Sequence, residues 1–169
     1  PTVKNQGQVG SCVAHALSTL IEYFNIRQNN NDTTMSVGYI YGNRPESGYR
    51  EKGMITKQAI AHLCSEGDVY HIDFPVNEEV PEIYDMLAPR LEELTAKARP
   101  FSFNTYFAVK TPEEIKAVLM KSGPVVIAVD WQKDMKVRNG VVYSEFKEKS
   151  GGHCMLLYGW NEKGWLIQN

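Results

Sequence analysis

Three kinds of side chain in this sequence could together carry nucleophilic chemistry: a thiol, an imidazole and an amide that orients the imidazole. Cys12 follows Gly10 and Ser11 at the start of an apolar helical pattern, and Ser11 is predicted to cap that helix. A helix N-terminus favours an anion, and a histidine that takes the proton lowers the thiol pKa further. Cys12 is therefore the candidate nucleophile. The candidate bases are His15, His62, His71 and His153.

The four histidines differ in their surroundings. His153 follows two glycines and begins an apolar stretch of strand length, so the backbone can approach closely and the imidazole edge stays open. His15 lies three residues after Cys12 on the same predicted helix, where it shares a face with the thiol and competes as base. His62 and His71 lie in polar sequence, and we expect both at the surface. The sequence favours His153 as the base.

The first half of the chain is predicted to be mainly helical. Apolar residues recur at helical spacing over 13–24, and an amide-rich stretch at 25–31 is predicted to end that helix. Similar patterns predict helices around 59–67 and 81–98. Residues 32–54 have no clear period and are predicted to form loops and turns.

The second half is predicted to be mainly strands around one helix. Aromatic residues at 101–107 form a strand-like stretch. Further strand candidates lie at 125–130, 153–158 and 164–168. The Thr-Pro-Glu-Glu segment at 111–114 is a capping box with proline at the first helical position, so it predicts a helix start. Helices followed by strands predict an α+β protein.

Composition excludes several classes of function. The 169 residues are 43% hydrophobic and 22% charged, as is usual for a globular protein. The net charge of −2, with both signs mixed, indicates neither nucleic acid nor an anionic membrane as partner, and no apolar run approaches the ~20 residues of a membrane span. The three cysteines allow at most one internal disulfide. This leaves the compartment open: secretion or the cell surface is favoured, and the cytoplasm is the alternative.

The order of these motifs resembles that of the papain-like cysteine peptidases. The segment Val3–Cys12, VKNQGQVGSC, is similar to the one that opens the mature domain of that family, with Gln6 six residues before the nucleophile. The pair Gly152-His153 resembles the family motif at the catalytic histidine. Asn169 follows His153 by sixteen residues at the end of a strand, as in the family. The similarity spans nearly the whole chain.

The resemblance implies a papain-like two-lobe fold. A helical N-terminal lobe would comprise residues 1–100, and an antiparallel, β-barrel-like C-terminal lobe residues 101–169, together forming one catalytic domain. The start at Pro1 and the strand that stops at Asn169 suggest missing segments at both ends, including C-terminal strands. The family's bridging cysteine has no counterpart near Val9. In lacking this bridge, the chain resembles bacterial or phage members of the family.

The resemblance also implies a role for each candidate residue. Cys12 would attack a peptide carbonyl and form a thioester acyl-enzyme, while His153 would accept and return the proton. Asn169 would fix the tautomer of the His153 ring, as in the Cys-His-Asn variant of the catalytic triad. The Gln6 side chain and the Cys12 backbone N–H would form the oxyanion hole.

The implied partners are an extended polypeptide substrate and a propeptide or protein inhibitor, without a cofactor. Gly53 and Gly152 are the candidate residues for binding the substrate backbone. Two alternatives use the same fold: a catalytically inactive module that binds peptides or other proteins, and a transpeptidase that passes the acyl group to an amine.

A metal site is the remaining alternative. Four soft ligands could come from Cys12, His15, His153 and Cys154. Consecutive residues of a strand point to opposite faces, however, so His153 and Cys154 should not bind one ion. We expect no metal, and we expect Cys64 and Cys154 to be buried small side chains.

Overall fold

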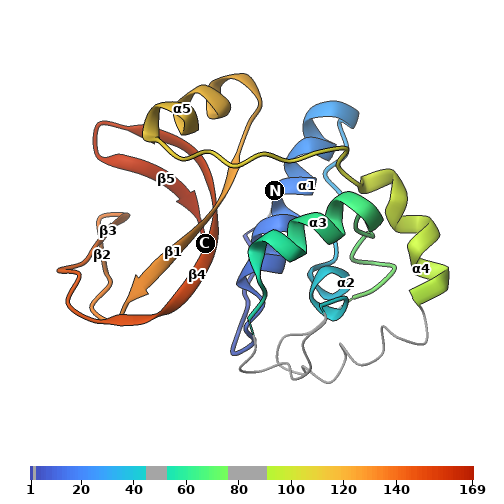
Figure 1. The fold of residues 1–169 in the computed structure, drawn as a ribbon, viewed down its shortest axis with the longest axis horizontal. Helices are drawn as coiled ribbons and strands as arrows, with labels where there is room; N and C mark the ends of the chain where they lie inside the picture. Colours follow the sequence, from blue (N-terminus) through green and yellow to red (C-terminus); the bar gives the residue numbers. More distant parts are fainter. Residues whose placement is uncertain (2, 45–52, 76–90) are drawn as a thin grey trace.

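The structure, a computed structural model, describes residues 1, 3–44, 53–75 and 91–169. Helices dominate the first half of the chain, and strands dominate the second half (Figure 1). The helices are α1 (Cys12–Asn29), α2 (Val37–Gly42), α3 (Thr56–Glu66), α4 (Leu91–Ala98) and α5 (Pro112–Lys121), with a 3-10 turn at Arg99–Phe101.

The strands pair only in antiparallel fashion in the part of the chain that the structure describes. They are β1 (Val125–Gln132), β2 (Lys136–Arg138), β3 (Val141–Tyr143), β4 (Lys149–Asn161) and β5 (Gly164–Gln168). One sheet has the order β1-β4-β5, and β2 and β3 form a separate hairpin. The predicted α+β class, with a helical half and an antiparallel half, is therefore confirmed. The lobe boundary at residue 100 stays a prediction.

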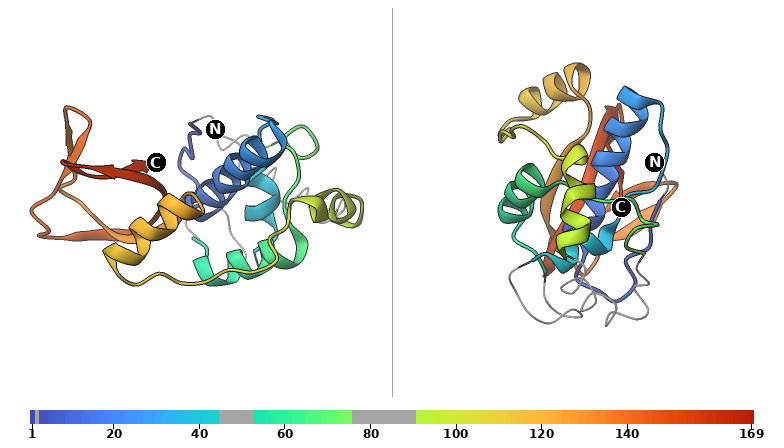
Figure 2. Two further views of the ribbon diagram at one scale, coloured as in Figure 1. Left: turned by 90° about the horizontal axis from the view of Figure 1, so that it is seen from above. Right: turned by 90° about the vertical axis from the view of Figure 1, so that its right-hand side faces the viewer.

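Helix α1 faces the sheet, and its apolar side packs against β4. Val13, Leu17 and Ile21 are buried along one side of this helix, at the spacing that the sequence pattern predicts. Cys154 of β4 is buried in the same core cluster, so the sheet and the helices share one core. Two views place α4 on the far side of the helical lobe from the sheet (Figures 1 and 2).

The first helix is longer than predicted. The amide-rich residues expected to end it belong to α1, which continues through Asn29. Asn29 donates a side-chain hydrogen bond to Asn25 one turn earlier, at 2.9 Å. Asn30 then ends the helix in the left-handed conformation, with φ of 51° and a 3.0 Å bond to the Ile26 carbonyl. Amides one turn apart thus support the helix, and only Asn30 stops it.

Two predictions for irregular regions are wrong. Residues 32–54, expected to form loops and turns, contain the six-residue helix α2, whose side chains are buried from Val37 to Tyr41 and so show no polar face. The turns expected at 45–52 lie outside the described residues. Residues 101–107, expected to form a strand, contain a 3-10 turn and an extended connection without strand partners. Phe101 and Phe103 instead pack individually on the helical core, where Phe101 contacts the Tyr70 ring at 4.8 Å.

The other predicted helices are confirmed where the structure describes them. α3 covers the helix expected around 59–67, and α4 covers the end of the helix expected over 81–98, whose residues 81–90 lie outside the described part. α5 begins with the predicted capping box, in which the Thr111 hydroxyl accepts from the Glu114 N–H at 3.2 Å. No helix in the described ranges is both long enough and apolar enough to cross a membrane.

Candidate active site

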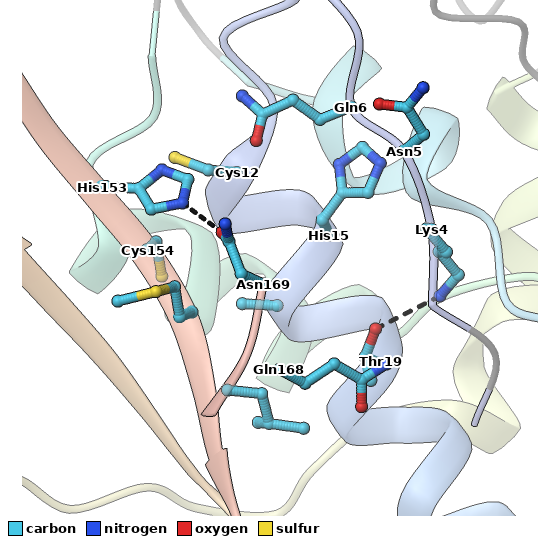
Figure 3. Close-up of a pocket in the computed structure, with 13 residues that line it drawn as sticks. Lys4, Asn5, Gln6, Cys12, His15, Thr19, His153, Cys154, Gln168 and Asn169 are labelled. Atoms are coloured by element: carbon cyan, nitrogen blue, oxygen red, sulfur yellow. Dashed lines mark hydrogen bonds between the residues drawn. The ribbon is translucent and has the colours of Figure 1, made fainter. Parts of the chain in front are cut away.

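A cavity of about 240 Å³ lies where the start of α1 meets β4 and the end of β5 (Figure 3). Its lining includes the four residues that the sequence predicts for catalysis: Gln6, Cys12, His153 and Asn169. His15, the competing base, lines the same cavity. The fold therefore brings together, from the two ends of the chain, the residues that the motifs singled out.

Helix α1 presents Cys12 as its first residue, half-buried beside the cavity. The preceding residue, Ser11, has the predicted N-cap position, but its hydroxyl makes no capping bond and is fully buried. The unpaired backbone N–H groups of the first turn therefore remain available to an anion at this helix end. A thiolate on Cys12 is such an anion.

Strands β4 and β5 place His153 and Asn169 next to each other. Leu156 of β4 pairs with Gln168 of β5, so the residue after Gln168 reaches the His153 ring. The Asn169 Oδ1 atom accepts a hydrogen bond from His153 Nε2, which leaves Nδ1 as the nitrogen available to a thiol. The Trp131 ring packs edge-on against the imidazole, with centroids 4.8 Å apart. Asn169 itself is exposed.

Cys12 and His153 stabilise each other's charged forms. Partial burial raises the pKa of the Cys12 thiol, but hydrogen bonds from His153 and from backbone N–H groups, together with the charge of His153, bring the pKa below its ordinary value. These backbone N–H groups are those of Cys154 and Val13. The hydrogen bond with Cys12 raises the pKa of His153, burial opposes the rise, and the bond to Asn169 reinforces it. These opposite shifts favour a thiolate–imidazolium pair.

Gln6 lies beside Cys12 at the rim of the cavity (Figure 3). Its side-chain Nε2 atom donates a 2.8 Å hydrogen bond to the Val9 carbonyl, which holds the amide on the loop before α1. A primary amide has two N–H donors, so one remains beyond that bond. This remaining N–H could donate a hydrogen bond to a substrate oxygen that lies near the Cys12 backbone N–H.

His15 has a different orientation from His153. Its Nδ1 atom is 3.0 Å from the Ser11 carbonyl, an acceptor within its own helix. Figure 3 shows the His15 ring below Gln6 and Asn5, on the other side of Cys12 from His153. The geometry therefore pairs Cys12 with His153.

The remaining predicted residues lie outside this arrangement or at its edge. Gly152 is exposed next to His153 and pairs with Asp130 of β1, and Gly53 is also exposed; neither glycine lines the cavity. A Cβ at either glycine would meet no atom within 4 Å. No group of three or more His, Cys, Asp or Glu side chains is placed to hold a metal among the residues that the structure describes.

His62, His71 and Cys64 lie outside the cavity, and Cys154 lines it as a buried thiol. His62 and His71, expected at the surface, are half-buried, and neither lines this cavity. Cys64, expected to be buried, is half-buried on α3. Cys154 is buried as expected, and burial with the nearby Cys12 charge raises its pKa to about 12, so its thiol stays protonated and unreactive.

Sequence reasoning overlooked two side chains at this site. Trp131 contacts the His153 ring, and Lys4 lines the cavity beside the segment that carries Gln6. Lys4 precedes Gln6 by two residues, a spacing that places both on one side of an extended segment. That alternation was the available signal for Lys4, whereas the position of Trp131 follows only from the pairing of β1 with β4.

A thiol and an imidazole that meet between a helical lobe and an antiparallel lobe define a cysteine peptidase of the papain type. The model of the papain family cysteine protease matches residues 1–169, and the chain belongs to this family. A search of curated proteins finds no match.

Solved structures share the fold at low sequence identity. Xylellain, a cysteine protease from Xylella fastidiosa, is 21% identical with a TM-score of 0.73, over 96% of this chain and 67% of that one. Digestive procathepsin L 3 of Tenebrio molitor is 16% identical with a TM-score of 0.75, over 100% of this chain and 56% of that one. Bromelain from Ananas comosus, in complex with the E64 inhibitor, is 19% identical with a TM-score of 0.62, over 100% of this chain and 77% of that one. The chain thus spans between 56% and 77% of the length of these three structures.

Proposed function

We propose that this protein is a cysteine endopeptidase that hydrolyses peptide bonds through a thioester intermediate on Cys12. The observation that carries the proposal is the pairing of Cys12 with His153, in which the thiol pKa is lowered and the imidazole pKa is raised. The cavity of about 240 Å³ beside this pair gives space for part of a substrate. Membership of the papain family supports the same reaction.

The first half of the reaction forms the acyl-enzyme. The Cys12 thiolate attacks the scissile carbonyl carbon, and the carbonyl oxygen becomes an oxyanion that accepts hydrogen bonds from the Cys12 N–H and the Gln6 amide. When the tetrahedral intermediate collapses, the C–N bond breaks and the His153 imidazolium donates its proton to the leaving amine. The products are a thioester on Cys12 and a free amino terminus.

The second half hydrolyses the thioester. Neutral His153 takes a proton from a water molecule, whose oxygen attacks the thioester carbonyl in the same oxyanion hole. Collapse breaks the C–S bond, releases the carboxylic acid and returns Cys12 and His153 to the ion pair. Asn169 keeps the Nε2 proton in place throughout, so Nδ1 does the proton transfer in both halves.

The substrate is proposed to be a polypeptide in extended conformation. Gly152, exposed next to His153, and Gly53 are the candidates for backbone contacts with it. Two of the similar structures, a procathepsin and a bromelain complex with the E64 inhibitor, suggest that a propeptide or an inhibitor occupies the same cleft in this protein.

Labelling with an epoxide inhibitor of the E64 type tests the proposal most directly. We expect one adduct, located on Cys12 by peptide mass spectrometry, and loss of casein hydrolysis in proportion to labelling. An adduct on Cys64 would contradict the assignment of the nucleophile. A protein that binds peptides without taking the label would be an inactive module. A product that incorporates an added amine in preference to water would identify a transpeptidase.

A further inference from the structure

A buried ion pair joins the segment before α1 to the middle of that helix. Lys4 Nζ lies 2.7 Å from Glu22 Oε1, and these side chains are only 12% and 2% exposed. The Glu22 carboxylate also accepts the Met35 backbone N–H at 2.8 Å. Charged side chains are rarely buried unless they are paired, and removing one partner of such a pair is costly. The Lys4–Glu22 contact is therefore a fixed attachment point.

Lys4 has no donor left for a substrate, although it lines the cavity. Its ammonium group has three N–H donors, and three acceptors surround it: Glu22 at 2.7 Å, the Ser18 hydroxyl at 2.5 Å and the Thr19 hydroxyl at 3.4 Å. The neighbouring carboxyl of Asp68 is fully buried, and burial raises its pKa well above its usual range. Glu22 is thus the principal counterion of Lys4.

Gln6 lies between two anchors. On one side is Lys4, attached to α1, and on the other is Val9, only 2% exposed in the core shared by α1 and β4. The remaining residues of this stretch, Asn5, Gly7 and Gln8, are exposed. The position of the Gln6 amide therefore depends on the two buried side chains that flank it.

The segment runs toward the N-terminus of α1, and this direction places Gln6 beside Cys12. Figure 3 shows Lys4 beside Thr19 and then Asn5 and Gln6 following along α1 toward its N-terminus. Lys4 attaches to Ser18, Thr19 and Glu22, which lie two to three turns beyond Cys12 on the same helix. One rigid helix thus holds both the nucleophile and the attachment point of the segment that carries Gln6.

We propose that Lys4 is a positioning residue for catalysis: through Glu22, Ser18 and Thr19 it fixes Gln6 in register with the Cys12 backbone N–H, and so assembles the oxyanion hole. The inference rests on the proposed peptidase function and adds a residue to it. Displacement of a catalytic group by about 1 Å can cost about 100-fold in rate, so a lost tether should be visible in kcat.

The experiment compares Lys4→Met, the double variant Lys4→Met/Glu22→Gln and a control, Lys97→Met, in the full-length protein. The control removes a surface ion pair with Asp73, of 2.7 Å, in the same lobe. With a fluorogenic peptide amide selected from a library, Lys4→Met should lower kcat by ~10- to 100-fold with KM nearly unchanged. Lys97→Met should match the unaltered protein. The pH profile of iodoacetamide labelling at Cys12 should not move, because the thiolate–imidazolium pair is intact.

The double variant separates positioning from stability. Glu22→Gln removes the unpaired buried charge and keeps an acceptor for the Met35 N–H, so the double variant should regain melting temperature while kcat stays low. Recovery of kcat together with stability would show that Lys4 is merely structural and would overturn the proposal.

A cycle with Gln6→Ala tests the route. Lys4→Met should lower kcat little further in a Gln6→Ala protein, because the positioned group is already absent. An equal loss in both backgrounds would overturn the inference. If the unaltered protein is active and Lys4→Met leaves kcat unchanged, only the role of Lys4 is overturned. If the unaltered protein neither cleaves peptides nor reacts with the epoxide, the proposed function is overturned, and this inference with it.

Discussion

The two lobes of the molecule bury their side chains to different degrees. In the helical lobe, tyrosines, leucines and valines from α1, α2 and α3 are almost fully buried, among them Leu17 at 1% and Tyr41 at 0% exposure. After residue 100, the buried apolar side chains are Pro124 and four consecutive residues of β4, Cys154 to Leu157. Apart from the buried Gln132 of β1, the strand residues around them are half-buried or exposed.

This difference assigns separate tasks to the two lobes. The core cluster around α1 consists of helical-lobe residues together with Cys154 of β4, and it fixes the start of α1 and therefore Cys12. The strand lobe is held to the same core through β4, in which the buried Cys154 directly follows His153. Cys12 thus lies on a helix whose core comes mainly from the helical lobe, whereas the position of His153 depends on packing across the junction.

The largest effect should come from removing the histidine of the strand lobe. His153→Ala should lower kcat by on the order of 10⁴-fold or more, because the members of a triad act as a unit. His15→Ala, which changes the histidine of the helical lobe, should lower kcat by less than about tenfold, since the His15 ring is turned toward Ser11. Steady-state hydrolysis of a fluorogenic peptide measures both. A larger loss for His15→Ala would reverse the assignment of the base.

A second large effect concerns the pH dependence of the thiol. The pKa of Cys12 is lowered and that of His153 is raised, and both shifts favour the ion pair in which Cys12 has lost a proton and His153 keeps one. Activity should rise with pH as Cys12 loses its proton and fall as His153 loses its own, which gives a bell-shaped profile.

Iodoacetamide labelling checks this pair from the side of the thiol. In the unaltered protein Cys12 should react well below pH ~8.5, the ordinary thiol value. In His153→Ala the labelling curve should shift upward, because burial still raises the thiol pKa and only backbone N–H groups oppose it. A curve that moves with His15→Ala instead would contradict the proposed pair.

A medium effect on stability should distinguish the two cores. Leu17→Ala, in the fully buried helical core, should lower the free energy of unfolding by about 2–5 kcal/mol. Leu119→Ala, on the half-buried face of α5, should cost about 1–2 kcal/mol, because less surface is removed from water. Urea unfolding followed by circular dichroism measures the difference. Equal losses would show that the strand lobe is as well packed as the helical lobe.

The smallest effect is expected at the start of α5. Thr111→Ala removes the hydroxyl that accepts the Glu114 N–H and should cost about 1 kcal/mol. Thr111→Ser keeps the acceptor and should cost less than about half of that. Hydrogen exchange of the first α5 amides reports the local change. Equal protection in both variants would show that the cap does not stabilise this helix.

Local signals decided how much of the fold was predictable. α1, α3 and α5 follow from periodicity and caps within a few residues, and β1, β4 and β5 from short apolar runs. α2 is too short for a period and is buried on every side, so its sequence carries no helical pattern. In the stretch 101–107, Phe101 and Phe103 pack on the helical core. Their alternation resembles a strand pattern in the sequence, although no strand forms there.

The candidate site was predictable for a similar reason. Motifs with fixed spacing single out Gln6, Cys12, His153 and Asn169, and the structure lines one cavity with all four, although their catalytic roles remain a proposal. Gly53, whose role was drawn from a looser motif, lies outside that cavity.

The sequence by itself determined the chemical types at the site, the start of the helix under Cys12 and the helix-then-strand order, because each depends on neighbours within one or two turns. Only the tertiary structure decided that Nε2 is the nitrogen of the His153 ring that bonds to Asn169, and that Lys4 pairs with Glu22 inside the protein. These contacts join segments that are distant along the chain. They form because α1 packs against β4, which removes apolar side chains of both lobes from water. No pattern within one segment encodes that packing.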